Sequence, residues 1–183
     1  TPERSILQGS CWKRLAQVQT GEARTAALSQ MESAYGEAWD LSPPKEQAYP
    51  ALMRSAARVL AYLREDTKSL KNDTKPQLQL IADAEDDGSA DFWALIMKAD
   101  AKLLLAIAAG RIKVAEEAEV VAIYRRAWRH VGSPVKLMSV LEQIDFLDDV
   151  LAEPKGRNIK REELLGALAR IRTTLETTMS ASA

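Results

Sequence analysis

The sequence predicts an all-α protein of about eight helices, stacked as antiparallel hairpins. Apolar residues recur at helical spacing along nearly the whole chain, and no window keeps the alternation of a half-buried strand. The chain also resembles itself at an offset of about 89 residues, since Tyr35-x-x-Ala38-Trp39 recurs as Tyr124-x-x-Ala127-Trp128. Self-similarity at a long period is typical of stacked helical repeats, which mostly supply binding surfaces.

Glycine and proline divide the first repeat unit, about residues 3–85, into four expected helices. These are expected at about residues 2–19, at about 23–40, from about residue 50 and from about residue 76. Gly21 and Pro43-Pro44 end the first two helices, whereas Pro50 and Pro76 suit the first turn of the next two. On the first helix, Leu7, Cys11, Leu15 and Val18 form the stripe expected to face the core.

The second repeat unit, about residues 89–180, is expected to hold four more helices. They lie at about residues 91–109, at 113–131, from residue 134, and at about 160–179. Gly110 and Gly21 occupy equivalent places at the 89-residue offset, and each suits the left-handed position after a helix. The repeated Tyr and Trp residues are expected to fill the core rather than bind a ligand. We expect residues 1–183 to form a single helical-repeat domain.

Composition narrows the classes of function. The net charge of −1 gives no field that would favour nucleic acid or an anionic membrane as the partner. Cys11 is the only cysteine, so the chain can form neither an internal disulfide nor a thiolate zinc site. Without a signal-peptide pattern, the sequence predicts a cytoplasmic protein. Because the chain starts with Thr1, we expect it to be a piece of a larger protein.

Two motifs carry a resemblance to the tetratricopeptide repeat. Tyr35-x-x-Ala38-x4-Pro43 and Tyr124-x-x-Ala127 resemble the end of such a repeat, and Gly9-x-x-Trp12 resembles a step in its first helix. The resemblance implies a right-handed solenoid of helical hairpins. Two hairpins in 89 residues are longer than the tetratricopeptide norm, however, and closer to the length of HEAT repeats.

A narrower resemblance covers about the first 65 residues. The segments 7–16, 35–38 and 49–52 resemble the repeat region near the TRAFs-binding domain of stress-activated kinase kinase kinases. They are also similar to bacterial multidomain proteins, some of which carry caspase-like CHAT protease domains. The resemblance implies a protein–protein interaction or regulatory scaffold module, whose partner is another protein or another domain of its own full-length chain. The alternative is a helical sensor or substrate-recognition segment of a larger effector enzyme, such as a CHAT-type protease or a kinase.

The sequence offers little chemistry, so we expect no enzyme, no cofactor and no metal site. It has no glycine-rich phosphate loop and no recognisable nucleophile–base motif. The acidic segment 83–94 has the oxygen spacing of a calcium loop, but Ala94 replaces the glutamate that closes such a site. We expect this loop to cap the next helix through Ser89 or Asp91.

Five basic residues are the candidate partner-binding site. In a tetratricopeptide-like stack, the first helix of each hairpin lines the concave face. Lys13, Arg54, Arg58, Lys98 and Lys102 lie on three of these helices, and Lys13 matches Lys102 at the repeat offset. Such a groove is expected to bind an acidic or carboxylate-bearing peptide, although aspartates of the seventh helix allow a mixed-charge groove instead.

Overall fold

The computed structural model describes residues 1–85, 91–131, 133–154, 156–157 and 159–180. Over these residues the fold is all-α, with eight α-helices, one short 3-10 helix and no strand. The elements are α1 (Pro2–Val18), α2 (Gly21–Leu41), η1 (Pro44–Glu46), α3 (Ala48–Leu63), α4 (Thr74–Ala82), α5 (Phe92–Ala108), α6 (Val114–Val131), α7 (Pro134–Leu151) and α8 (Arg161–Ser180). The expected helices therefore all form, within a few residues of their expected ends.

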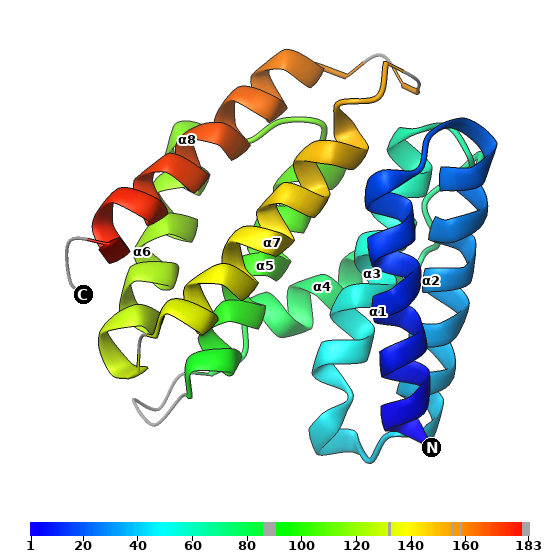
Figure 1. Ribbon diagram of the computed structural model, residues 1–183, viewed down its shortest axis with the longest axis horizontal. Helices are drawn as coiled ribbons and strands as arrows, with labels where there is room; N and C mark the ends of the chain where they lie inside the picture. The colour runs from blue at the N-terminus through cyan, green and yellow to red at the C-terminus, as the bar shows by residue number, and fades with distance from the viewer. Residues whose placement is uncertain (86–90, 132, 155, 158, 181–183) are drawn as a thin grey trace.

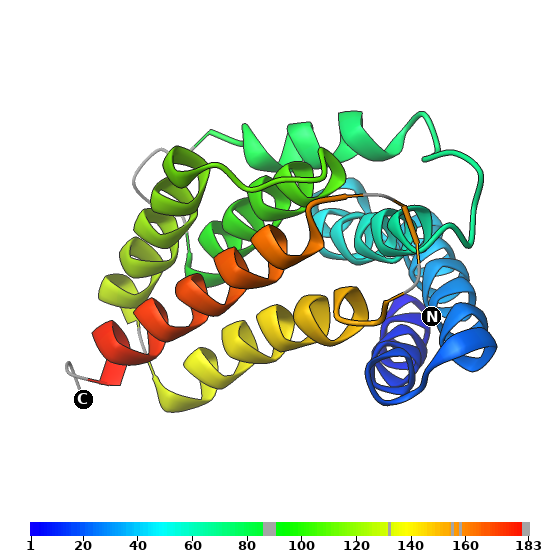
Figure 2. The same cartoon turned by 90° about the horizontal axis from the view of Figure 1, so that it is seen from above.

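The helices form two groups that share α7 as a connection. Each of the first five α-helices packs against the next one in the chain, and α1, α2 and α3 lie together at one end of the molecule (Figure 1). In the other group, α8 packs against both α6 and α7. From there α7 reaches back to α1 and α3, which places its carboxyl end beside the α1–α2 turn (Figure 2).

Local sequence explains where two of these helices begin. Asp91 accepts a hydrogen bond from the backbone nitrogen of Ala94 at 2.8 Å, so it caps α5 as expected. Ser133 caps α7 in the same way, and Pro134 occupies the first turn, where a missing N–H costs nothing. The other expected cap, Ser89, lies with residues 86–90 outside the described residues.

The two repeated tyrosines lie at the centre of the core. Tyr35 and Tyr124 are both fully buried, and each hydrogen bonds to the first helix of its own unit. Gly9 makes room for Tyr35, since a Cβ at this glycine would come within 2.7 Å of the ring. Gly21 and Gly110 adopt φ angles of 58° and 77°, as expected for a glycine that reverses the chain after a helix.

The expectation for the buried face of α1 was wrong. Leu7 and Val18 are 66% and 77% exposed, and Cys11 and Leu15 are exposed as well. The buried residues of α1 are instead the small ones, Ser5, Gly9 and Ala16, which let its backbone approach α2 closely. The apolar stripe thus faces away from the core.

The repeated tryptophans pack against the core but are less enclosed than the repeated tyrosines. Trp39 and Trp128 are half-buried at the edge of the core, whereas the neighbouring tyrosines are enclosed. Trp39 is covered on one side by the guanidinium group of Arg54, which lies 4.8 Å from the ring centre. Each tyrosine is therefore enclosed more completely than the tryptophan four residues after it.

Candidate functional site

The candidate site is a cavity of about 630 Å³ between α1, α3, α5 and α7. These are the four helices expected to line one face of the stack, and every described residue that lines the cavity lies on one of them. Its volume lies within the range of about 300–1,000 Å³ that is usual for small-molecule sites. The residues that line it are Ser10, Lys13, Arg14, Gln17, Tyr49, Leu52, Met53, Trp93, Ile96, Met97, Asp100, Ser139, Glu142 and Gln143.

The walls of the cavity are apolar and its mouth is aromatic. Leu52, Met53 and Ile96 are buried and form the inner wall. Tyr49 and Trp93 are 40% and 47% exposed, so each presents part of its ring to solvent at the rim. An apolar interior with a few polar groups is the usual composition of a binding pocket.

Lys13 places a cation inside this cavity. Its ammonium nitrogen donates a hydrogen bond to Oε1 of Gln143 at 2.5 Å and lies 5.1 Å from the centre of the Phe146 ring. Burial lowers the pKa of Lys13 to about 8, although the nearby carboxylates of Asp100 and Glu142 favour the charged form. Lys13 is therefore a partly desolvated cation whose hydrogen bond goes to a neutral amide.

Asp100 places an anion in the same cavity. It is 6% exposed and accepts a hydrogen bond from the hydroxyl group of Tyr124 on α6. Burial raises the pKa of Asp100 to about 6, against the opposite effects of the Tyr124 hydrogen bond and the Lys13 charge. Like Lys13, this carboxylate hydrogen bonds to a neutral side chain.

Gln143 leaves one hydrogen-bond donor unused. The side chain is 5% exposed, and its Oε1 is engaged by Lys13. Its Nε2 has no hydrogen-bond partner, and among the described residues that line the cavity it is the only buried side-chain polar atom in that state. A buried amide donor without a partner costs about 1–3 kcal/mol, which a bound acceptor would recover.

Two further charges lie at the rim. Arg14 and Glu142 are exposed residues of α1 and α7, and both line the cavity. Together with Lys13 and Asp100 they give the cavity two cations and two anions, so its formal charge is zero when all four are ionised. The cavity is thus of mixed charge, but its anions are Asp100 and Glu142 and not the aspartates of the seventh helix on which the mixed-charge alternative rested.

Two of the predicted basic residues are engaged elsewhere in the fold. Arg58 donates to Glu32 at 2.8 Å and to Asp73 at 3.0 Å. Arg54 donates to Gln77 at 3.0 Å, and both arginines are nine-tenths buried. These contacts join α3 to α2 and α4, on the side of α3 away from the cavity.

Lys98 and Lys102 also lie outside the cavity. Lys98 donates to the backbone oxygen of Ala84, after α4, and Lys102 forms a 2.9 Å ion pair with Glu119 on α6. Of the five predicted residues, only Lys13 lines the cavity, so the structure does not gather the five on one surface. Their role in binding a partner stays a prediction.

The sequence analysis did not identify Asp100 or Gln143 as site residues, although the sequence around Asp100 indicates a buried carboxylate. It stands within the apolar helix sequence FWALIMKADAKLLLAIA, where a carboxylate needs a reason to be buried. No feature of the sequence indicates a role for Gln143, since a glutamine between Glu142 and Ile144 is ordinary on an amphipathic helix.

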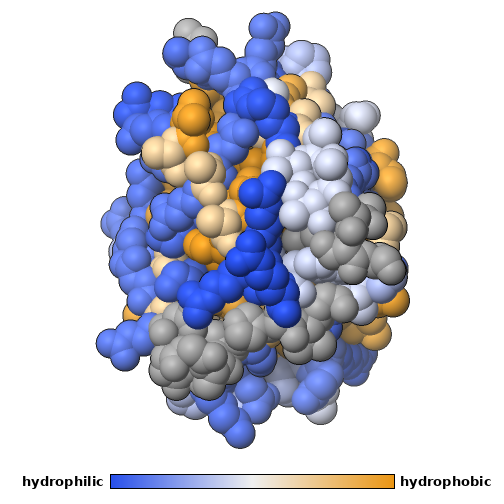
Figure 3. Space-filling view, turned by 90° about the vertical axis from the view of Figure 1, so that its left-hand side faces the viewer, coloured by the Kyte–Doolittle hydropathy of each residue, from blue (hydrophilic) through white to orange (hydrophobic). Residues whose placement is uncertain are grey.

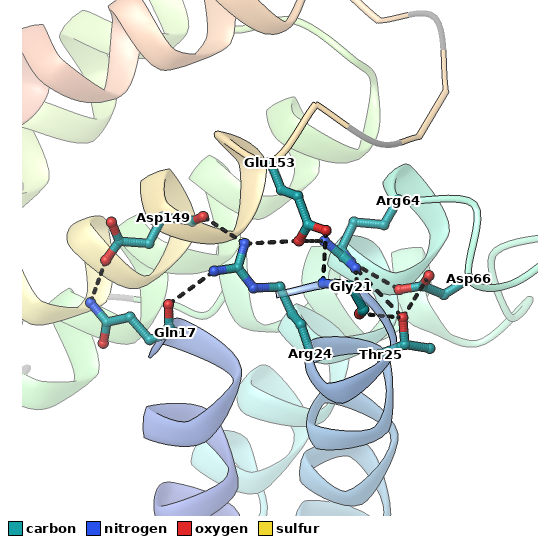
Figure 4. A network of polar contacts seen from close by, with 8 residues as sticks. All are labelled: Gln17, Gly21, Arg24, Thr25, Arg64, Asp66, Asp149 and Glu153. Carbon is teal, nitrogen blue, oxygen red and sulfur yellow. Dashed lines mark hydrogen bonds and ion pairs between the residues drawn. The ribbon is translucent and has the colours of Figure 1, made fainter. Parts of the chain in front are cut away.

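A buried ionic network holds the cavity walls in place (Figure 4). Glu153, after α7, accepts hydrogen bonds from Arg24 on α2 and from Arg64 after α3. Arg64 is 1% exposed and also bonds to Asp66, while Arg24 donates to the backbone oxygen of Asp149 at 2.9 Å. The network ties the carboxyl end of α7 to the ends of α1 and α3 and to the start of α2.

The face that carries α6 and α8 has a different character. Hydrophilic residues cover much of it, with hydrophobic residues between them left of the centre and along the right-hand edge (Figure 3). Ion pairs link its helices to their neighbours, including Arg170 to Glu117 and Arg172 to Asp145.

Comparisons of the chain with protein-family models, with curated proteins and with solved structures found no match. Within the described residues, no helix combines the length and hydrophobicity needed to cross a membrane. Nor do these residues bring together three or more histidine, cysteine, aspartate or glutamate side chains in a way that could hold a metal ion.

Proposed function

We propose that the chain is a protein–protein interaction module, built from helical hairpins in a tetratricopeptide-like arrangement. The observation that carries this proposal is the cavity, whose described wall residues all lie on α1, α3, α5 and α7. Paired in chain order, these are the first helices of four successive hairpins. A concave face lined by first helices is where such stacks hold a segment of a partner.

Repeated local features support the proposal of an internal duplication. In both units a buried tyrosine of the second helix bonds back to the first helix, Tyr35 to Ser10 and Tyr124 to Asp100. In both units a glycine with positive φ lies at the turn between the two helices, Gly21 as the first residue of α2 and Gly110 after the end of α5. The units differ beyond this point, because α2 packs against α3 whereas α6 packs against α8.

The rim of the cavity suits a partner segment that inserts an apolar side chain. The half-exposed rings of Tyr49 and Trp93 offer apolar area at low conformational cost, as aromatic residues do at interface hot spots. Arg14 and Glu142 beside them would select the polar groups that flank the inserted side chain.

Site-resolved photocrosslinking tests this function. A photoreactive phenylalanine analogue replaces Ser139 or Trp93 at the cavity, and Leu80, which is 76% exposed on α4, serves as the matched control position. We expect one protein to be captured from both cavity positions and not from position 80. Equal capture from position 80, or capture of unrelated proteins from the two cavity positions, would contradict the proposal.

A further inference from the structure

The floor of the cavity holds two opposite charges that are not satisfied by ionic hydrogen bonds. Lys13 bonds to the amide of Gln143, and Asp100 bonds to the hydroxyl group of Tyr124. Both charges are largely removed from water, and a buried charge is stable only when it is well paired. The fold thus keeps a cation and an anion in one apolar cavity with neutral partners.

The unused donor of Gln143 indicates which kind of group is missing. Its Nε2 lies on the same amide as the oxygen that receives Lys13, so a single oxygen acceptor can approach both groups after a small rotation of the side chain. A carboxylate has about four lone-pair positions, enough to accept from Lys13 and Gln143 together. Asp100, which lines the same cavity from α5, retains acceptor capacity beyond its bond from Tyr124.

We propose that the floor of the cavity binds a small zwitterion with an apolar side chain, of which an apolar α-amino acid is the simplest. Its carboxylate accepts from Lys13 and Gln143, and its ammonium group donates to Asp100. Its side chain lies against Leu52, Met53 and Ile96. The formal charge of the cavity, two cations and two anions, is balanced by a ligand of zero net charge but not by an anion or a cation alone.

This site goes beyond the proposed partner binding, because it concerns the floor of the cavity rather than its rim. The two proposals can also fail separately, since ligand binding is measured on the purified chain without any partner, whereas crosslinking reports a protein.

The affinity should depend on pH in a recognisable way. The ligand requires Lys13 charged and Asp100 ionised, and burial brings their pKa values to about 8 and about 6. The other groups that face this pair are Arg14 on α1, Glu142 on α7 and Tyr124 on α6, whose pKa is raised well above its usual range by burial. Binding is therefore strongest between about pH 6 and about pH 8 and weakens on both sides.

Isothermal titration of the full chain with leucine, methionine, phenylalanine and tryptophan tests the proposal. Glycine controls for the side chain, N-acetylphenylalanine for the ammonium group and phenylalaninamide for the carboxylate. We expect saturable binding of at least one apolar amino acid. Removal of either charge from the ligand should weaken binding at least about 10-fold, the loss expected for one charge-assisted hydrogen bond.

The substitution Gln143→Glu makes the sharpest protein variant, because it exchanges one nitrogen for one oxygen. It keeps an acceptor for Lys13, so the melting temperature should not fall, but it replaces the unused donor by a charge that repels the ligand carboxylate. The matched control is Lys98→Met, on α5 but outside the cavity.

We expect Gln143→Glu to reduce binding at least about 10-fold and Lys98→Met to leave it unchanged. Unchanged binding in a folded Gln143→Glu variant would overturn the proposal. So would the absence of saturable binding for all four amino acids, or equal affinity for phenylalanine and for either of its blocked derivatives.

Discussion

Replacement of Asp100 by asparagine should change how stability depends on pH. The folded state raises the pKa of Asp100 from its ordinary value of 3.8 to about 6. At about 1.4 kcal/mol per pKa unit, the ionised carboxylate costs the folded state about 3 kcal/mol at neutral pH. Because the folded state binds this proton more tightly, the stability that protonation provides is fully present below about pH 4 and is lost as the pH rises through about 6.

The asparagine keeps an oxygen that accepts from Tyr124, but it cannot ionise. Its amide group also brings a buried donor, whose cost of about 1–3 kcal/mol does not vary with pH. We therefore expect the difference in unfolding free energy, variant minus wild type, to rise by about 2–3 kcal/mol between about pH 4 and about pH 7. The pH dependence separates the titration of Asp100 from the constant effect of the new amide.

Urea unfolding followed by circular dichroism at several pH values measures this difference. Asp40→Asn, on the exposed side of α2, is the matched control and should follow the wild type at every pH. Parallel stability curves for Asp100→Asn and wild type would show that the carboxylate is not desolvated in the folded state. The argument for an unsatisfied charge pair in the cavity would then be refuted.

Three further substitutions test the packing. Gly9→Ala places a Cβ 2.7 Å from the buried ring of Tyr35, so the free energy of unfolding in urea should fall by about 1–2 kcal/mol despite the better helix propensity of alanine. An unchanged unfolding midpoint would contradict this contact. Gly156→Ala would place a Cβ 2.2 Å from the backbone oxygen of Leu63, at a φ of 124°, so we expect it to lower the free energy of unfolding more than Gly9→Ala does. A smaller decrease than that of Gly9→Ala would count against the packing of the α7–α8 segment on α3. Leu7→Ser should change the free energy of unfolding by no more than about 0.5 kcal/mol in the same assay, because Leu7 is 66% exposed. A decrease of several kcal/mol would show that Leu7 is buried in the core.

The positions of the helices could be predicted from the sequence, because apolar spacing and the breaks at glycine and proline are local properties. The buried side of α1 could not. Its apolar stripe has the character of a core face. The small residues Ser5, Gly9 and Ala16 nevertheless allow α2 to approach more closely, and they are the residues of α1 that are buried. Spacing along one helix identifies its faces without saying which of them a neighbour covers.

The candidate site, too, could be predicted from the sequence only in part. The repeat pattern predicted that the first helices line one face, and residues of α1, α3, α5 and α7, with Lys13 among them, line the cavity. Arg54 and Arg58 share a helix face, as their spacing indicates, but this face turns towards acidic residues of α2 and α4. Which partner a charged side chain meets depends on how helices far apart in sequence come together, as Asp100 and Lys13 do.

The central claim is that the cavity between α1, α3, α5 and α7 is where this chain binds its ligands. The four tryptophans report on this claim, since Trp93 lies at the cavity rim, Trp12 beside the exposed stripe of α1, and Trp39 and Trp128 at the edges of the core. A titration followed by the four indole N–H signals in nuclear magnetic resonance spectra, with the best-binding amino acid and then with the crosslinked partner, should move the Trp93 signal in both cases. Movement of the Trp12, Trp39 or Trp128 signal with that of Trp93 unchanged would contradict the claim.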